Sequence, residues 1–152
     1  MIDDLYSSRI LKLAANTPRA GRLDAPDGSS EKVAKLCGSR IHVDMKVRDG
    51  EVVDFAQEVK ACALGQAAAG VLGQSVIGAT VEELDQARQA MIAMLKAGGD
   101  GPVGRFEGLR ALKQVADYPA RHASTLVAVE ATLDAVREAQ RKTSRTPIAG
   151  AA

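Results

Sequence analysis

The sequence predicts an α+β fold in which helices cover one face of a three-stranded antiparallel sheet. Residues 41–48 alternate between apolar and polar side chains, the pattern of a strand with one buried face. Asp49 and Gly50 supply the positive-φ chemistry of a tight hairpin turn, and residues 51–55 are the predicted returning strand. Elsewhere apolar residues recur every three or four positions, which indicates amphipathic helices. Three strands are the smallest sheet that is stable when helices cover one face.

The first third of the chain contains one predicted helix and one further strand. Residues 2–15 place their apolar side chains on one helical face, and the helix ends before Pro18, which cannot continue it. Residues 19–31 are polar and rich in turn formers, with the clearest turn at 26–30. We expect the third strand, at an edge of the sheet, to span residues 33–36.

Two helices are predicted after the hairpin. Residues 61–71 are almost all small, which favours a helix that approaches the sheet closely. Thr80 and Glu83 form a capping box that begins the next helix. A glycine-rich connection at residues 97–102 ends that helix. Its expected buried stripe consists of Leu84, Ala87, Met91, Met94 and Leu95.

The last third is also predicted to be helical. A short helix is expected at residues 109–115 and a long one at about 120–141. Residues 143–152 contain too little apolar surface to pack, and we expect a disordered tail there. The whole of residues 1–142 therefore forms a single predicted domain.

Composition and charge exclude several classes of function. The formal net charge is +1 and aromatic residues make up 3% of the chain, which disfavours nucleic-acid binding. The acidic N-terminus does not resemble a secretory signal, and no apolar run reaches the ~20 residues of a membrane span. Two cysteines cannot form a disulfide framework, so we expect a cytoplasmic protein with free thiols and no membrane partner.

The two cysteines, Cys37 and Cys62, are the first candidates for chemistry. Their spacing matches no zinc motif, and free cysteines commonly act as small buried hydrophobes. However, Cys37 precedes Gly38 at the start of a predicted strand, and Cys62 opens a predicted helix, where the helix dipole favours a thiolate. Both interpretations remain open from the residues alone. No phosphate-binding loop or serine-nucleophile motif is present.

Four segments follow one another in a characteristic order. They are the first helix with Asn16-Thr17-Pro18-Arg19, then Cys37-Gly38, then Ala61-Cys62-Ala63, and finally Tyr118-Pro119-Ala120-Arg121-His122-Ala123-Ser124-Thr125-Leu126. In this order they resemble the IscU/NifU-type iron–sulfur cluster scaffold family, and in particular its SufU-like branch. The insertion between Met94 and Leu112 is also similar to that branch, and the resemblance covers roughly residues 4–138.

The chain departs from the family pattern at three positions. Ser39 stands where the family has an aspartate, Ser124 replaces the third cysteine, and Ala61 replaces a glycine. The resemblance implies that Cys37 and Cys62 bind the cofactor, a [2Fe–2S] cluster or zinc. Serine is a poor ligand for either, so the cofactor is expected to be weakly held.

His122 is the third expected metal ligand, because imidazole binds both iron and zinc. It lies one position before the place of the family's histidine, and the alternative is a partly exposed residue at a helix start. His42 falls on the polar face of its strand and is expected to be solvated. Ser124 has its own alternative, as a hydroxyl that satisfies a backbone group at the helix start.

The resemblance implies a scaffold or carrier rather than an enzyme. Its implied partners are a cysteine desulfurase, which would supply sulfur, and acceptor apo-proteins, which would receive the assembled unit. A second hypothesis is a protein-interaction module on the same fold that has lost metal binding. The replaced ligands at Ser39 and Ser124 favour this second hypothesis, and the two retained thiols favour the first.

Overall fold

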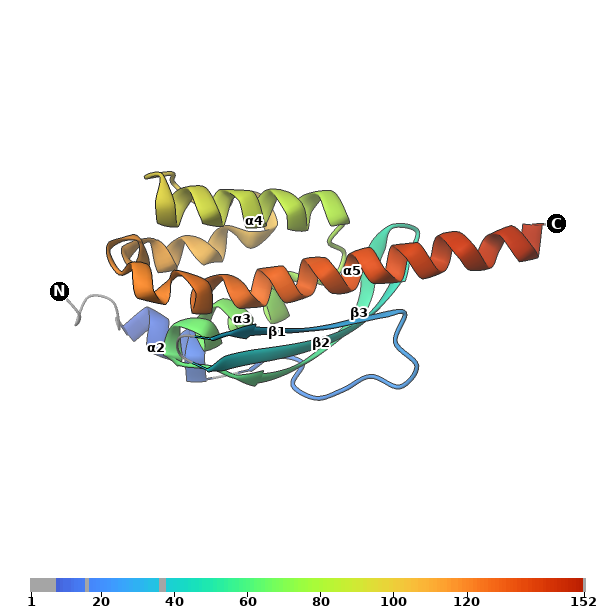
Figure 1. Cartoon of the computed structure of the whole chain (residues 1–152), viewed down its shortest axis with the longest axis horizontal. Helices are drawn as coiled ribbons and strands as arrows, with labels where there is room; N and C mark the ends of the chain where they lie inside the picture. The colour runs from blue at the N-terminus through green and yellow to red at the C-terminus, as the bar shows by residue number, and fades with distance from the viewer. Residues whose placement is uncertain (1–7, 16, 36–37, 152) are drawn as a thin grey trace.

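The computed structural model describes residues 8–15, 17–35 and 38–151, and the side chains as far as residue 142. Figure 1 shows a three-stranded sheet with helices stacked in layers on one of its faces. The elements in chain order are α2 (Ser8–Ala15), β1 (Gly28–Ala34), β2 (Ser39–Arg48), β3 (Glu51–Lys60), α3 (Ala63–Ser75), α4 (Val81–Lys96), the 3₁₀ helices η1 (Gly104–Asp117) and η2 (Pro119–Arg121), and α5 (His122–Ala151).

The predicted antiparallel sheet is confirmed, with strand order β1-β2-β3. The hairpin turn has φ values of 55° at Asp49 and 80° at Gly50, as the turn chemistry predicts. The apolar residues of β2 from Ile41 to Met45 alternate into the core. The predicted position of β1 was wrong: the strand begins at Gly28, so residues 28–30 pair with β2 instead of forming a turn. The serines there gave no alternating apolar signal.

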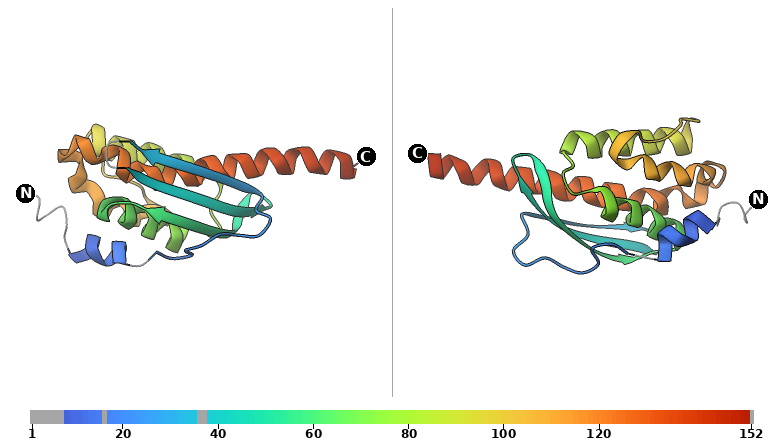
Figure 2. Two further views of the ribbon diagram at one scale, coloured as in Figure 1. Left: turned by 60° about the horizontal axis from the view of Figure 1, so that its bottom comes forward. Right: turned by 180° about the vertical axis from the view of Figure 1, so that it is seen from behind.

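Two layers of helix cover the sheet. Figures 1 and 2 show α5 lying along the sheet beside α3, with α4 on the far side of α5. The capping box of α4 is confirmed, because Thr80 Oγ1 accepts from the Glu83 backbone N–H and the Glu83 carboxylate accepts from Thr80 N–H. All five residues of its predicted stripe are buried. None of the described helices has both the length and the apolar surface of a membrane span.

The last third differs from its prediction in helix type and length. The expected short helix is a longer 3₁₀ segment, η1, with a kink at Phe106 (φ −104°, ψ 21°). The backbone of α5 is helical to Ala151 rather than ending near residue 141. Adding residues to an existing helix avoids the cost of nucleation, which explains how a segment with little apolar surface can extend it.

Glycine permits the closest approach between α5 and the sheet. A Cβ atom at Gly28 would lie 2.1 Å from the backbone oxygen of Ala135 and 2.7 Å from the backbone nitrogen of Ala139. Both atoms belong to the helix backbone and cannot move independently. Any side chain at position 28 would therefore push α5 away from β1.

The substitution Gly28→Ala is expected to lower the free energy of unfolding by about 2–3 kcal/mol, because it overpacks this contact. Urea denaturation followed by circular dichroism measures the change. The control is Ser30→Ala on the same strand, which we expect to change stability by less than about 0.5 kcal/mol. Equal stability of the Gly28→Ala and wild-type proteins would contradict the packing argument.

Candidate functional site

The ends of three elements meet beside the Cys62 thiol. Cys62 is the N-cap residue of α3, and Ser124 lies in the first turn of α5. The Cys62 Sγ and Ser124 Oγ atoms are 3.8 Å apart. A Cβ atom built on Gly65 would lie 3.1 Å from the Ser124 carbonyl oxygen and 3.9 Å from Ser39 Oγ, so β2 begins at the same place. Residues distant in the sequence therefore form one site.

Cys62 is partly exposed as a residue, and it packs against the hydrophobic core. It occupies the N-cap position of α3 without forming a side-chain cap hydrogen bond, and its backbone carbonyl accepts from the Gln66 N–H at 2.9 Å. The thiol hydrogen is directed at Ser124 Oγ, a weak hydrogen bond. The thiol of this partly exposed residue has only a weak hydrogen-bond partner and so remains chemically available as a ligand or nucleophile.

The two serines that the sequence resemblance puts at expected ligand positions are both buried. Ser124 is 1% exposed, and its hydroxyl donates to the Arg121 carbonyl oxygen at 3.0 Å, as its helix-start alternative expects. Ser39 is 2% exposed at the first position of β2. Cys37, the other predicted thiol ligand, lies outside the described residues, and its ligand role stays a prediction.

His122 is buried, with 8% of its surface exposed, rather than partly exposed as its alternative expects. Its Nε2 atom lies 3.0 Å from the Val115 carbonyl oxygen and 3.2 Å from that of Ala116. Because both carbonyls are acceptors, Nε2 carries the proton, and only Nδ1 is left with a lone pair for a metal. Within the described residues, no three His, Cys, Asp or Glu side chains are grouped so as to hold a metal ion.

Comparison with known proteins identifies the family. The model of the NifU-like N-terminal domain matches residues 5–144, which is most of the chain. The chain belongs to the NifU-like N-terminal domain family. It is also 28% identical over 137 residues to the iron–sulfur cluster assembly scaffold protein IscU of Thermotoga maritima, which covers 90% of this chain and 96% of that protein.

Solved structures agree with this NifU-like assignment. The N-terminal part of a nitrogen-fixing NifU-like protein from Brucella abortus is 51% identical, with a TM-score of 0.90, and the match covers 93% of this chain and 98% of that one. A protein from Fervidobacterium islandicum, proposed as a cluster assembly scaffold for the SUF system, is 20% identical with a TM-score of 0.79 over 87% of this chain and 96% of its own, and shares the fold.

The predicted family and fold are thereby confirmed. The family match and the IscU scaffold protein among the relatives place the chain in a scaffold family rather than an enzyme family, as the sequence predicts. The site at Cys62 lies where α3 and α5 begin, at the left end of Figure 1. Its serines at positions 39 and 124 occupy the same site as the thiol.

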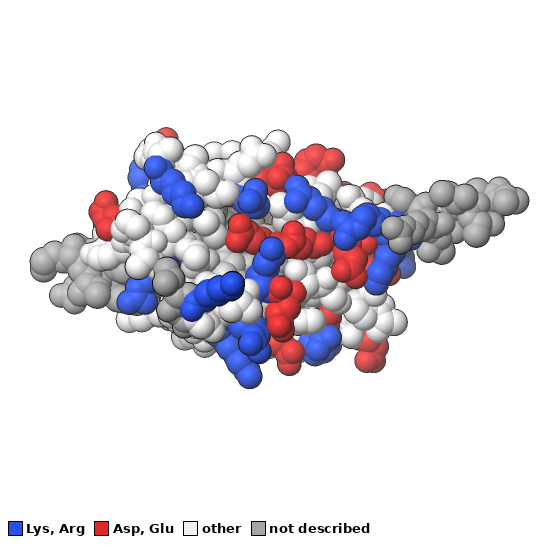
Figure 3. Space-filling model, viewed as in Figure 1, with Lys and Arg blue, Asp and Glu red and all other residues white. Residues whose placement is uncertain are grey.

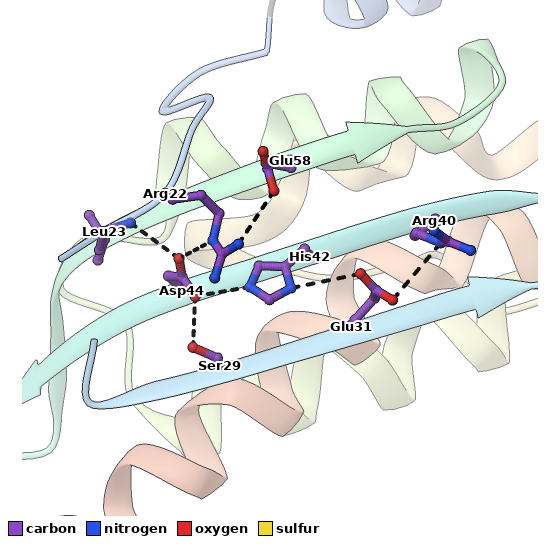
Figure 4. A network of polar contacts seen from close by, with 8 residues as sticks. All are labelled: Arg22, Leu23, Ser29, Glu31, Arg40, His42, Asp44 and Glu58. Carbon is purple, nitrogen blue, oxygen red and sulfur yellow. Dashed lines mark hydrogen bonds and ion pairs between the residues drawn. The ribbon is translucent and has the colours of Figure 1, made fainter. Parts of the chain in front are cut away.

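A second polar cluster lies on the sheet face that the helices do not cover (Figure 4). Asp44 in the middle of β2 is completely buried there, under the segment that precedes β1. Its carboxylate accepts from Arg22 Nε at 2.6 Å, from Leu23 N–H at 3.1 Å and from Ser29 Oγ at 2.7 Å. His42 Nε2 lies 3.0 Å from the same carboxylate.

The expectation that His42 is solvated was therefore wrong, since its side chain is only 20% exposed and contacts both Asp44 and Glu31. The cause is that residues 17–27 cross this face of the sheet. They bury side chains that the alternation of the strand predicts to be exposed to solvent. Sequence reasoning missed Asp44 altogether. Its one signal was an aspartate in mid-strand, where that residue is rare.

The same segment is also anchored at the β3 edge. Gln57, 1% exposed, donates through Nε2 to the carbonyl oxygens of Pro18 and Ala69. Its backbone accepts from Gly21 N–H and donates to the Arg19 carbonyl, each at 2.9 Å. Asp44 and Gln57 together hold residues 17–27 against the sheet.

Burial alone would raise the pKa of Asp44, but the hydrogen bonds from Arg22, Ser29, Leu23 and His42 outweigh it and hold that pKa well below its ordinary value. A lowered pKa in the folded state stabilises the fold above the ordinary carboxyl pKa of about 3.9. That stabilisation is lost as the pH falls below this value toward the folded-state pKa.

The substitution Asp44→Asn is expected to destabilise the protein by about 2–4 kcal/mol at pH 7, because it breaks a buried ionic network. The difference from wild type should shrink as the pH falls below about 4, where the stabilisation by ionised Asp44 is itself lost. Urea denaturation at a series of pH values measures both effects.

The matched control for this experiment is Asp134→Asn, which removes a half-exposed ion pair with Lys32 (3.0 Å). Its expected effect is below about 1 kcal/mol at any pH. A loss at Asp134 as large as that at Asp44, or a pH-independent loss at Asp44, would show that the buried network does not stabilise the segment.

Proposed function

We propose that this scaffold binds iron, an iron–sulfur cluster or zinc through the thiolates of Cys37 and Cys62. The observation that carries the proposal is the partly exposed Cys62 thiol at the start of α3, 3.8 Å from the serine that replaces the family's third cysteine. Cys37 precedes Ser39 by two residues in the sequence, and Ser39 Oγ lies beside the same site. His122 is the third proposed metal ligand, through Nδ1.

The surroundings of Cys62 suit an anionic sulfur cargo. The first backbone N–H groups of a helix have no partner within the helix, and the dipole is positive at that end. A metal thiolate or a persulfide at Cys62 carries negative charge and is stabilised there. Sulfur would be delivered to these thiols by a cysteine desulfurase, and the cargo passed to acceptor apo-proteins, in a reducing cytoplasmic compartment.

The replaced ligands make the cargo labile. The Ser124 hydroxyl keeps its proton in a hydrogen bond to Arg121, and a neutral hydroxyl is a hard, weak donor for iron or zinc. Two thiolates supply half of the four that commonly hold a [2Fe–2S] cluster. We infer that the cargo is held more weakly than in a three-cysteine relative and is released more readily. The insertion that contains η1 supports placement in the SufU-like branch.

A second candidate function is a protein-interaction module without cargo. It is favoured by the hydrogen bonds at Ser124, which satisfy the hydroxyl in the absence of any metal. In this case the fold would dock the same partners, and the thiols would be unused.

The two functions differ in metal content. After anaerobic purification, we expect bound iron or zinc, with sulfide where a cluster is present, and loss of most of it in both Cys37→Ala and Cys62→Ala. Metal and acid-labile sulfide analysis per chain provides the measurement, with circular dichroism to verify folding. Metal-free wild-type protein, after incubation with ferrous iron and sulfide or with zinc, would leave the interaction module as the function.

The substitution Ser124→Cys is expected to raise bound iron and sulfide by roughly twofold or more, because it places a third soft ligand beside Cys62. The matched control is Thr132→Cys, which also replaces a buried hydroxyl that donates to the α5 backbone, at 2.8 Å from the Ala128 oxygen. An equal gain in both variants would show that the added thiol acts without regard to the Cys62 site.

A further inference from the structure

All three strands carry a basic residue at the end of the sheet next to Cys62. Lys35 directly follows β1, Arg40 is the second residue of β2, and Lys60 is the last residue of β3. Arg40 and Lys60 are paired directly across the two strands, so their side chains lie on the same face. We call these three residues the basic strand ends.

The positive charge of the basic strand ends is only partly compensated by neighbouring carboxylates. Arg40 has one carboxylate partner, Glu31, at a loose 3.9 Å. Within the described part of the chain, Lys35 and Lys60 form no ion pair. Like charges placed directly opposite each other on neighbouring strands destabilise a sheet. The pair of Arg40 and Lys60 therefore costs stability in the isolated protein, a cost that an external carboxylate would remove.

The far end of the same sheet is mixed in charge, because Arg48, the last residue of β2, is paired there with Glu51 among carboxylates. Asp27 precedes β1, Asp49 lies in the hairpin turn and Glu51 begins β3. Figure 3 shows mainly basic side chains toward its left end, where α5 begins, and basic and acidic side chains mixed across the middle and right. The net charge of the chain is only +1, so the basic end reflects how charges are distributed and not an overall excess.

A hollow of about 280 Å³ lies beside the basic strand ends, lined by Glu31, Arg40, His42, Glu58, Val59 and Lys60. The two glutamates in it already contact arginines, Glu31 with Arg40 and Glu58 with Arg22 at 3.7 Å. Lys60 is the lining cation without such a partner among the described residues. The hollow can thus accept an acidic side chain from another protein.

We propose that the basic strand ends dock an acidic segment of a partner protein and bring that partner's reactive sulfur to Cys62. The role of Cys62 in this inference rests on the proposed function, whereas the docking surface rests on the charges alone. Complementary charge raises association rates and orients the partner, and both effects weaken with salt. The surface thereby favours acidic segments of a partner protein over neutral or basic segments.

The test uses peptides that carry one cysteine as a mixed disulfide with 5-thio-2-nitrobenzoate, flanked by glutamates, glutamines or lysines. In the Cys37→Ser chain, the Cys62 thiolate attacks the peptide sulfur. The new disulfide joins Cys62 to the peptide, and the coloured nitrobenzoate thiolate leaves. We expect the glutamate peptide to react on the order of tenfold faster than the lysine peptide at low salt. Near 1 M salt, where the screening length is about 3 Å, the ratio should approach one.

Charge-reversal variants test which residues cause the difference in rate between the glutamate and lysine peptides. Lys35→Glu and Lys60→Glu should each reduce the glutamate-to-lysine rate ratio, and Lys60→Glu should keep the fold because it places an opposite charge across from Arg40. The control Arg141→Glu makes the same charge change at an exposed site on α5 and should leave the ratio unchanged. Equal rates for the three peptides would overturn the proposal of a docking surface. An equal fall of the glutamate-to-lysine rate ratio in the Arg141 variant would overturn it as well. Absence of bound metal would contradict the proposed function and leave this result standing.

Discussion

The close contact between the first turns of α3 and α5 is the constraint on which the site depends. Gly65 makes it possible, since a Cβ atom there would lie 2.8 Å from the Ala61 Cβ and 3.1 Å from the Ser124 carbonyl oxygen. With no side chain between them, the two helices bring Cys62 to within 3.8 Å of Ser124 Oγ. The sequence of small residues in α3 is thus a requirement of the site as well as of the core.

The opposite face of the sheet supplies a rigid base for that contact. Asp44 is buried on that face and accepts from Arg22 and Leu23, while Gln57, on the helix-covered face, donates to the carbonyl oxygen of Pro18. Buried polar groups stabilise a unique arrangement only when all their hydrogen bonds are made. The described residues leave no buried side-chain nitrogen or oxygen without a partner. The sheet is consequently held from both sides, and the strand ends that carry the site have a defined position.

The proposed chemistry of the site depends on two buried hydroxyl groups, Ser39 and Ser124, at positions where the sequence resemblance implies stronger ligands. The chain belongs to a family of cluster assembly scaffolds, and the function proposed for it is a carrier that holds its cargo briefly. Fast release requires that a partner be positioned at the same moment, and the basic strand ends beside Cys62 provide an electrostatic means of doing so.

Much of this architecture could be predicted from the sequence because its causes are local. The alternation around Ile41, the turn at Asp49 and Gly50, and the capping box at Thr80 depend on neighbours within a few residues, and each was confirmed. The start of β1 was wrong because the serines near Gly28 join the sheet through backbone hydrogen bonds and through contact with α5, which no local pattern records.

By itself, the sequence determined the fold class, the family resemblance and the residue types available for chemistry. Only the tertiary structure decided which of them meet. The burial of Asp44 and His42 arises from a segment about 20 residues away, and the pairing of Cys62 with Ser124 spans 62 positions. Such contacts depend on how helices and strands pack, and packing is a property of the whole chain rather than of any window of its sequence.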